Sequence, residues 1–108
     1  MDAEAQRQII AAVEARRDNV VSLLQRLVQV DSVTGNETEI QAFIAATLRE
    51  MALEVDEFDA DPDALRQYPG FLEPEKPMAG RPNVVGVWRG RGGGRSLLLN
   101  GHVDTVPL

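Results

Sequence analysis

The sequence predicts an α/β fold in which two helices come first and β-strands, including a hairpin, follow. Its first half has apolar residues at helical spacing, and its last third has short β-rich segments separated by glycines. The most apolar of these segments comes last, at residues 96–100. Because parallel strands need long crossover connections, we expect residues 1–108 to be the N-terminal portion of a larger domain.

Composition narrows the classes of function. The chain has 108 residues, of which 44% are hydrophobic and 26% charged, as in an ordinary soluble domain. Its net charge of -6 argues against nucleic acid and anionic membranes as partners. Since it has no cysteine, a bound metal would need His, Asp or Glu ligands. The N-terminus lacks the pattern of a signal peptide, so we expect a cytoplasmic protein.

Residues 9–28 are predicted to be helical. A polar interruption at Arg16, Arg17 and Asp18 permits either one continuous helix or a second helix that starts at Asn19 with Asp18 as its cap, and the continuous helix is favoured. The apolar residues that recur at spacings of three and four are Ile9, Ile10, Val13, Val20, Leu23, Leu24, Leu27 and Val28.

A further helix is predicted after the turn-forming residues 31–36. Asn36 and Glu39 have the spacing of a capping box, and Glu37 and Glu39 would lie near the positive end of the helix dipole. The apolar face of this helix is Ile40, Phe43, Ile44, Leu48 and Met51.

Strands are predicted from Glu54 and in the last third of the chain. Between them, residues 59–82 contain five of the six prolines and are expected to form a surface insertion, which Tyr68 and Phe71 would anchor. Residues 83–88 and 96–100 are predicted to form a hairpin around the glycine-rich residues 89–95. Three consecutive leucines in the second strand indicate that both of its faces are covered.

The candidate metal-binding residues follow that last strand. His102 is the only histidine, and Asp104 lies two residues later, so both side chains would point to one side of an extended chain. A histidine that binds zinc commonly donates its other ring N–H to a carboxylate, which fixes its tautomer. A His-x-Asp pair alone is more often an ordinary polar pair, and catalytic zinc normally has three protein ligands.

The longer motif is more specific. Residues 100–107, Asn-Gly-His-Val-Asp-Thr-Val-Pro, resemble the first signature of the M20 family of metallopeptidases and deacylases, which includes acetylornithine deacetylase and succinyl-diaminopimelate desuccinylase. Residues 81–86, 90–95 and 96–99 are similar to the hairpin that leads into this signature, and residues 32–37 to the segment before the family's second helix. The similarity spans most of the chain.

This resemblance implies an α/β/α zinc-peptidase-like catalytic domain that holds two zinc ions, for which cobalt can substitute. His102 would bind one zinc and Asp104 would be the catalytic residue that orients it. The other ligands, the glutamate base and a lid domain with dimer contacts would lie beyond Leu108. The implied substrates are N-acyl amino acids, the complete protein would be a homodimer, and residues 1–108 alone would be inactive.

Three other interpretations remain open. Within the family, a dipeptidase or carboxypeptidase is the alternative to a deacylase. Outside it, the chain would be a non-enzymatic binding module that uses residues 59–82 as an interaction loop. The third interpretation takes the arginine- and glycine-rich residues 89–95 as a phosphate-binding loop or a nucleic-acid-binding segment. They lack the Gly-Lys-Ser/Thr ending of a nucleotide loop, so a hairpin turn is favoured there. Trp88 is interpreted as a packing residue.

Overall fold

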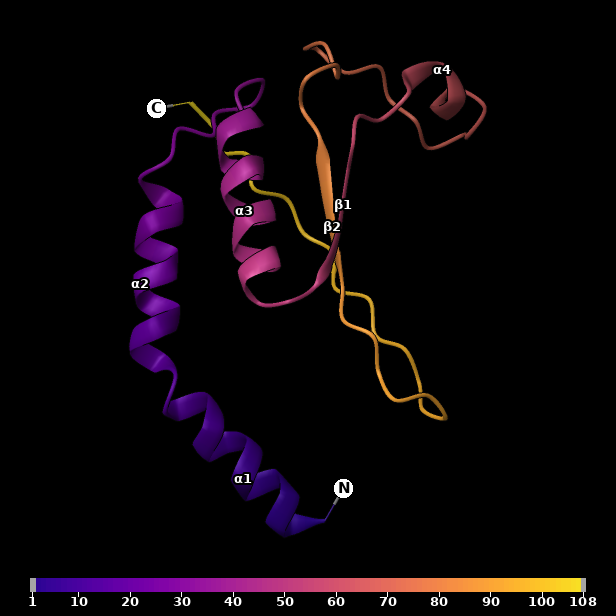
Figure 1. The fold of residues 1–108 in the computed structure, drawn as a ribbon. Helices are drawn as coiled ribbons and strands as arrows, with labels where there is room; N and C mark the ends of the chain where they lie inside the picture. Colours follow the sequence, from indigo (N-terminus) through magenta and orange to yellow (C-terminus); the bar gives the residue numbers. More distant parts are fainter. Residues whose placement is uncertain (1, 108) are drawn as a thin grey trace. The chain divides into compact units, whose positions relative to one another are not determined.

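The computed structural model describes residues 2–107, which fall into two units that divide after Val30. The first unit contains the helices α1 (Ala3–Glu14) and α2 (Arg17–Val28). The second contains α3 (Thr38–Glu50), β1 (Glu54–Phe58), α4 (Pro62–Leu65) and β2 (Asn83–Val87), as labelled in Figure 1. The chain therefore mixes helices and strands, as its sequence predicts.

The prediction of one continuous N-terminal helix is wrong, because the helix breaks at Arg16. The Arg16 amide bonds to the Val13 carbonyl, only three residues back, at 3.0 Å. Its guanidinium donates to the Ala12 carbonyl at 3.2 Å and so satisfies an acceptor in the last turn of α1. The next helix begins at Arg17 and has no side-chain cap, so the alternative start at Asn19 is also incorrect.

Most of the large apolar side chains in the two helices of the first unit are exposed. Neither contains a buried residue. Among residues 2–107, no helix has both the length and the apolar character needed to cross a bilayer. Leu23 and Leu27 are half-buried. The other large apolar side chains of α1 and α2 are between 47% and 73% exposed, and these are Ile9, Ile10, Val13, Val20, Val21, Leu24 and Val28.

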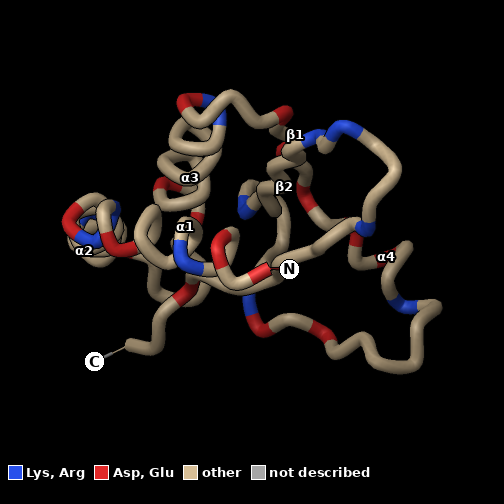
Figure 2. Tube along the Cα trace, turned by 90° about the horizontal axis from the view of Figure 1, so that it is seen from below, with Lys and Arg blue, Asp and Glu red and all other residues tan. Residues whose placement is uncertain are grey.

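In the second unit, α3 packs on a two-stranded antiparallel sheet formed by β1 and β2. The register pairs Glu54 with Val87 and Phe58 with Asn83. In β2, half-buried Val84 and Gly86 alternate with exposed residues, as expected for a strand covered on one face. Figure 2 marks the charged positions along the trace: β1 carries three carboxylates, whereas β2 carries no charge.

At Gly86 the backbone of β2 passes close to two leucine side chains. A Cβ at Gly86 would lie 3.0 Å from methyl carbons of both Leu48 and Leu53, too close without a shift of one of these side chains. The core of this unit is small, since Ile40 and Ala45 are its buried apolar residues. Ile40 belongs to the predicted apolar face of the helix, whereas Met51 from that same prediction is 60% exposed.

The start of α3 is close to the predicted position, but the predicted capping box is wrong. The side chain of Asn36 donates to Asp31 at 2.9 Å, and the N-cap residue is Glu37, which forms no side-chain cap bond. At the other end, Ala52 has a φ of 61° and the Leu53 amide bonds to the Leu48 carbonyl at 3.1 Å. This is the left-handed helix ending that glycine usually occupies.

The predicted C-terminal hairpin is also wrong. Residues 83–87 do form a strand, but their partner is β1, and residues 96–100 are not in a strand. Residues 88–100, which we call the arm, leave the sheet and double back (Figure 1). Leu97, Leu98 and Leu99 are 83% to 85% exposed, so the expected cover on both faces is missing among the described residues.

Residues 59–82 form the predicted surface segment, with one short helix, α4, that the sequence analysis did not foresee. Asp61 caps α4 through a 2.9 Å bond from the Asp63 amide. Tyr68 is 60% exposed and does not anchor the segment, whereas Phe71 is half-buried. The end of the segment is held by polar contacts instead, since the Gly80 amide donates to Asp59 at 2.8 Å.

Candidate functional site

The segment that carries His102 and Asp104 is fixed by backbone contacts to the turn before α3. Val33 and Thr105 form an isolated parallel bridge. The Thr105 amide donates to the Ser32 carbonyl at 2.8 Å, and the Thr34 amide donates to the Thr105 carbonyl at 3.1 Å. These hydrogen bonds hold residues 102–105 beside residues 32–34. Ser32, at the start of this short ladder, is buried.

The structure places His102 and Asp104 together, as their spacing predicts. His102 Nδ1 lies 2.9 Å from Asp104 Oδ1. Since an ionised carboxylate only accepts hydrogen bonds, Nδ1 is the donor and Nε2 of the neutral ring keeps its lone pair. The His102 side chain is 84% exposed and that of Asp104 is 34% exposed, so Nε2 is accessible to a metal ion.

The second oxygen of Asp104 also has a partner. The Thr34 hydroxyl donates to Oδ2 at 2.8 Å. This hydrogen bond, followed by the one from His102, holds the pKa of Asp104 below its usual range. Asp104 therefore remains ionised. It accepts hydrogen bonds from His102, its near neighbour in sequence, and from Thr34, which is 70 residues away.

A second carboxylate near this segment is neutralised by an arginine. Arg81 donates to Glu37 through Nε at 2.5 Å and through Nη2 at 2.6 Å, and its Nη1 donates to the Pro77 carbonyl at 3.1 Å. The Glu37 side chain is only 7% exposed and Arg81 is 21% exposed. The hydrogen bond from Arg81 is the main cause of the lowered pKa of Glu37. The negative charge of Asp104 also contributes to the raised pKa of Arg81, so the guanidinium interacts electrostatically with both carboxylates.

We call Thr34, Glu37, Arg81, His102 and Asp104 the polar cluster. A pocket of about 260 Å³ lies against it. The pocket is lined by residues from α3, from the end of the 59–82 segment, from the start of β2 and from the His102 segment, namely Glu37, Gln41, Pro74, Met78, Arg81, Pro82, Asn83, Gly101, His102, Val103 and Asp104.

The donor set fits a zinc site only in part. His102 has the carboxylate partner that metal-bound histidines commonly have. Within residues 2–107, however, no group of three or more His, Asp or Glu side chains is arranged to hold a metal ion. The described residues therefore supply fewer than three such ligands, and a catalytic zinc, which normally has three protein ligands, would need others from elsewhere.

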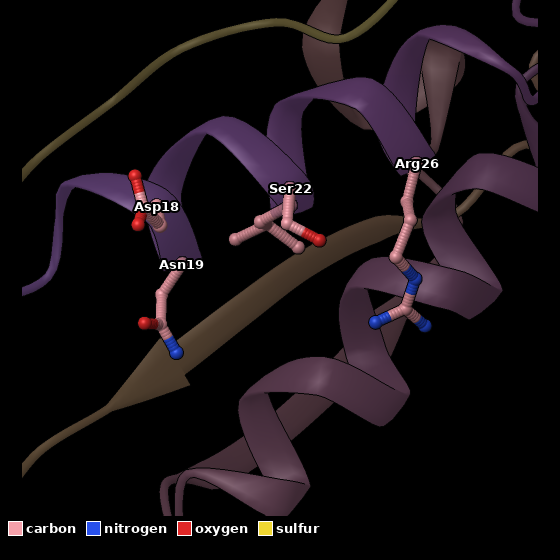
Figure 3. A pocket seen from close by; sticks show the side chains of 5 residues that line it. Asp18, Asn19, Ser22 and Arg26 are labelled. Atoms are coloured by element: carbon pink, nitrogen blue, oxygen red, sulfur yellow. The ribbon is translucent and has the colours of Figure 1, made fainter.

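Another hollow, of about 380 Å³, lies on α2 and contains no member of the polar cluster. Its lining residues all come from this one helix, and Figure 3 shows four of them, Asp18, Asn19, Ser22 and Arg26. A hollow lined by a single helix is an open depression, and we assign it no chemistry.

Trp88, interpreted from the sequence as a packing residue, is instead 83% exposed.

Thr34, Glu37 and Arg81 were not foreseen as part of the site. Their segments, residues 32–37 and 81–86, resemble segments of the M20 family, and the sequence places Glu37 near the positive end of the helix dipole. The signal that would have found them is a buried carboxylate with a distant arginine, which one sequence does not reveal. Comparison with known proteins adds no further guide, because no family model, no curated protein and no solved structure matches the chain.

Proposed function

We propose that the chain supplies one zinc ligand and its carboxylate partner to a zinc-dependent amidohydrolase that removes acyl groups from N-acyl amino acids. The observation that supports this most is the 2.9 Å contact between His102 Nδ1 and Asp104 Oδ1, within the motif that resembles the M20 signature. In this proposal residues 1–108 are the N-terminal part of a zinc-peptidase-like catalytic domain.

The roles follow from the chemistry of the two side chains. His102 binds the metal through Nε2, and Asp104 accepts from Nδ1, which fixes the tautomer and makes the ring a stronger ligand. Bound zinc would polarise the amide carbonyl and lower the pKa of a water molecule. Asp104 contacts the metal-binding residue His102, and its contribution is to keep that imidazole oriented.

The proposal requires groups that residues 2–107 do not provide. A second zinc, the remaining ligands and the general base belong to other parts of the complete protein, which we propose to be a cytoplasmic homodimer. Cobalt is expected to replace zinc. Residues 1–108 alone should not hydrolyse N-acetyl amino acids with either metal, and turnover by the pure chain would contradict the proposal.

The first test is His102→Ala in the protein encoded by the complete gene. Loss of a metal ligand should lower the bound zinc per subunit and remove most of the turnover of N-acetyl amino acids. Tyr68→Ala is the control, because Tyr68 is 60% exposed and belongs to no part of the cluster. Metal analysis by mass spectrometry decides, and unchanged zinc with unchanged turnover would exclude His102 from the site.

The second test separates the partner from the ligand. Asp104→Asn keeps the shape of the side chain and removes the charge that supports the imidazole. Zinc affinity or activity should fall by roughly 10- to 100-fold, the usual effect of removing such a partner. Calorimetric zinc titration and turnover are both measured on the complete protein. Wild-type values in both would return Asp104 to an ordinary surface carboxylate.

A binding module is the second candidate function, and the exposed apolar side chains favour it. Leu97, Leu98 and Leu99 are 83% to 85% exposed, and clustered apolar exposure often marks an interaction surface. This function needs no metal and no residues beyond the chain. It predicts no amide hydrolysis and a partner binding that neither zinc nor His102→Ala changes, whereas the amidohydrolase predicts zinc-dependent hydrolysis that His102→Ala removes.

A further inference from the structure

Asp104 holds His102 with one oxygen while its other oxygen is held by Thr34. The two distances are 2.9 Å to His102 Nδ1 and 2.8 Å from the Thr34 hydroxyl. A carboxylate on a short side chain can rotate about its terminal bond, and one hydrogen bond does not stop that rotation. Two hydrogen bonds to different oxygens fix the plane of the group.

We infer that Thr34 is a positioning residue, whose hydroxyl fixes the Asp104 carboxylate and thereby keeps the His102 proton on Nδ1 and the Nε2 lone pair free for metal. The metal part of this inference rests on the proposed function, whereas the tautomer part does not. The Thr34 hydroxyl donates to Asp104, so its effect on His102 is expected to pass through that carboxylate.

The Thr34 hydroxyl is itself fixed in place. Its backbone amide donates to the Thr105 carbonyl at 3.1 Å, next to the Val33–Thr105 bridge. The turn that follows is closed by the Asn36 amide, which donates to the Val33 carbonyl at 2.8 Å. Threonine is also stiff at χ1 because it is β-branched. The backbone and the rotamer together set the position of Oγ1.

The hydroxyl has a single proton, and two acceptors lie near it. Thr34 Oγ1 is 2.8 Å from Asp104 Oδ2 and 3.5 Å from the Thr105 carbonyl oxygen. A charged acceptor at the shorter distance forms the stronger hydrogen bond, so the proton points to Asp104. The second contact is at the outer limit for a hydrogen bond.

Arg81 does not replace Thr34 in this role. Within the part of the chain that the structure describes, Arg81 donates to Glu37 and to the Pro77 carbonyl, and it interacts with Asp104 through its charge. A charge at a distance favours the ionised carboxylate without fixing its orientation. The directional contact on Oδ2 is therefore the one from Thr34.

The test uses the fact that the chain has one histidine, so the imidazole nitrogen signals in an NMR spectrum belong to His102 alone. Spectra of the 108-residue chain are recorded at about pH 8, where an ordinary imidazole is neutral. The Nδ1-protonated form should dominate in the wild type. Thr34→Val removes the hydroxyl at nearly constant shape and should shift the signals towards the Nε2-protonated form, which an unrestrained histidine side chain prefers.

Two further variants separate positioning from folding. Thr34→Ser retains the hydroxyl and should restore the wild-type tautomer. Thr47→Val removes a hydroxyl that donates to the Phe43 carbonyl inside α3, and it should leave the His102 signals unchanged. Backbone amide spectra of each variant establish folding. A wild-type tautomer in Thr34→Val, or no rescue by Thr34→Ser, would overturn the inference.

The metal part is measured on the complete protein. Thr34→Val should weaken zinc binding roughly tenfold, at the low end of the range for outer partners of zinc ligands, and Thr34→Ser should not. If the wild-type protein binds no zinc, the proposed function fails while the tautomer result stands. If it binds zinc and Thr34→Val binds it equally well, the proposed function stands and the positioning role of Thr34 in metal binding fails.

Discussion

The polar cluster and the arm are both made of irregular chain in the same unit, yet they are held very differently. Asp104 and Glu37 accept hydrogen bonds from residues far away in sequence, and backbone hydrogen bonds form a short ladder between residues 32–34 and 105. The arm has the most apolar run of the chain, and its leucines are exposed. Apolar character alone does not order a segment; a partner surface or a directional contact does.

The largest effect that would break this comparison is expected from Arg81→Ala. This change leaves the Glu37 carboxylate, 7% exposed, without its cation. Removing one partner of a largely buried pair is strongly destabilising, and the partial exposure of Arg81 reduces the expected cost to about 3 kcal/mol of unfolding free energy. Urea unfolding followed by circular dichroism measures it.

The matched control is Arg89→Ala. Arg89 also makes two hydrogen bonds to one glutamate, Glu54, at 2.6 and 2.8 Å, but the two side chains are 74% and 60% exposed. Solvent screens an exposed pair, so Arg89→Ala should lower the unfolding free energy far less than Arg81→Ala does. Equal losses in the two variants would mean that burial of the polar cluster does not stabilise the fold.

A pH titration should sharpen the same contrast. Arg81 lowers the pKa of Glu37 below its ordinary value of 4.5, and Thr34 and His102 lower that of Asp104. A carboxyl whose pKa is lower in the folded state stabilises the fold above its unfolded pKa, and this contribution is lost as the pH falls through the folded pKa. Unfolding free energy should therefore decrease from about pH 5 downward.

Glu37→Gln identifies the group responsible for that pH dependence. Without the carboxyl, the decrease below about pH 5 should be shallower than in the wild type, and what is left comes from Asp104 and other acids. Stability is measured by urea unfolding at several pH values. Parallel curves for the two proteins would show that Glu37 does not contribute to the acid sensitivity.

Hydrogen exchange tests the two regions directly. The amides of Thr34 and Thr105 donate to backbone carbonyls at 3.1 and 2.8 Å, whereas Leu97 to Leu99 lie outside any helix or strand. The first two should exchange roughly tenfold or more slowly than the leucines, after correction for intrinsic rates. Protected leucine amides would indicate that the arm has a partner in solution.

The smallest effect is expected in the arm itself. Leu98 is 85% exposed, so Leu98→Ser should change the unfolding free energy by less than about 0.5 kcal/mol. Ile40→Ala is the comparison, because Ile40 is 4% exposed and its truncation should cost about 2 kcal/mol or more. A cost above about 1 kcal/mol for Leu98→Ser would contradict an uncovered arm.

Local patterns predicted the parts of the fold that depend on neighbours in sequence. The apolar spacing around Ile40 placed α3, and the β-rich residues 83–87 and 54–58 placed two strands. Strand pairing could not be read in the same way, because β2 has two candidate partners and the choice depends on which one packs under α3. The break at Arg16 lies at the polar interruption in the apolar pattern, but that pattern does not decide between one continuous helix and two.

The candidate site divides along the same line. His102 and Asp104 are two residues apart, so the extended chain already brings them together, and the structure has them 2.9 Å apart. Thr34, Glu37 and Arg81 join them through contacts between distant residues. Such contacts depend on the path of the chain between them, which the spacing of residues in one sequence does not specify.

The hydrogen bond between Thr34 and Asp104 joins residues 70 positions apart, and this has a consequence for the length of the chain between them. The entropy lost on closing a loop grows only with the logarithm of its length, so a doubling of the intervening segment costs only about 0.6 kcal/mol. Much of that segment is surface chain, in residues 59–82 and in the arm. Insertions or deletions in residues 62–73, which lie outside the polar cluster and its pocket, and in the arm should leave the geometry at His102 nearly unchanged, so these two stretches can differ in length while the site stays the same.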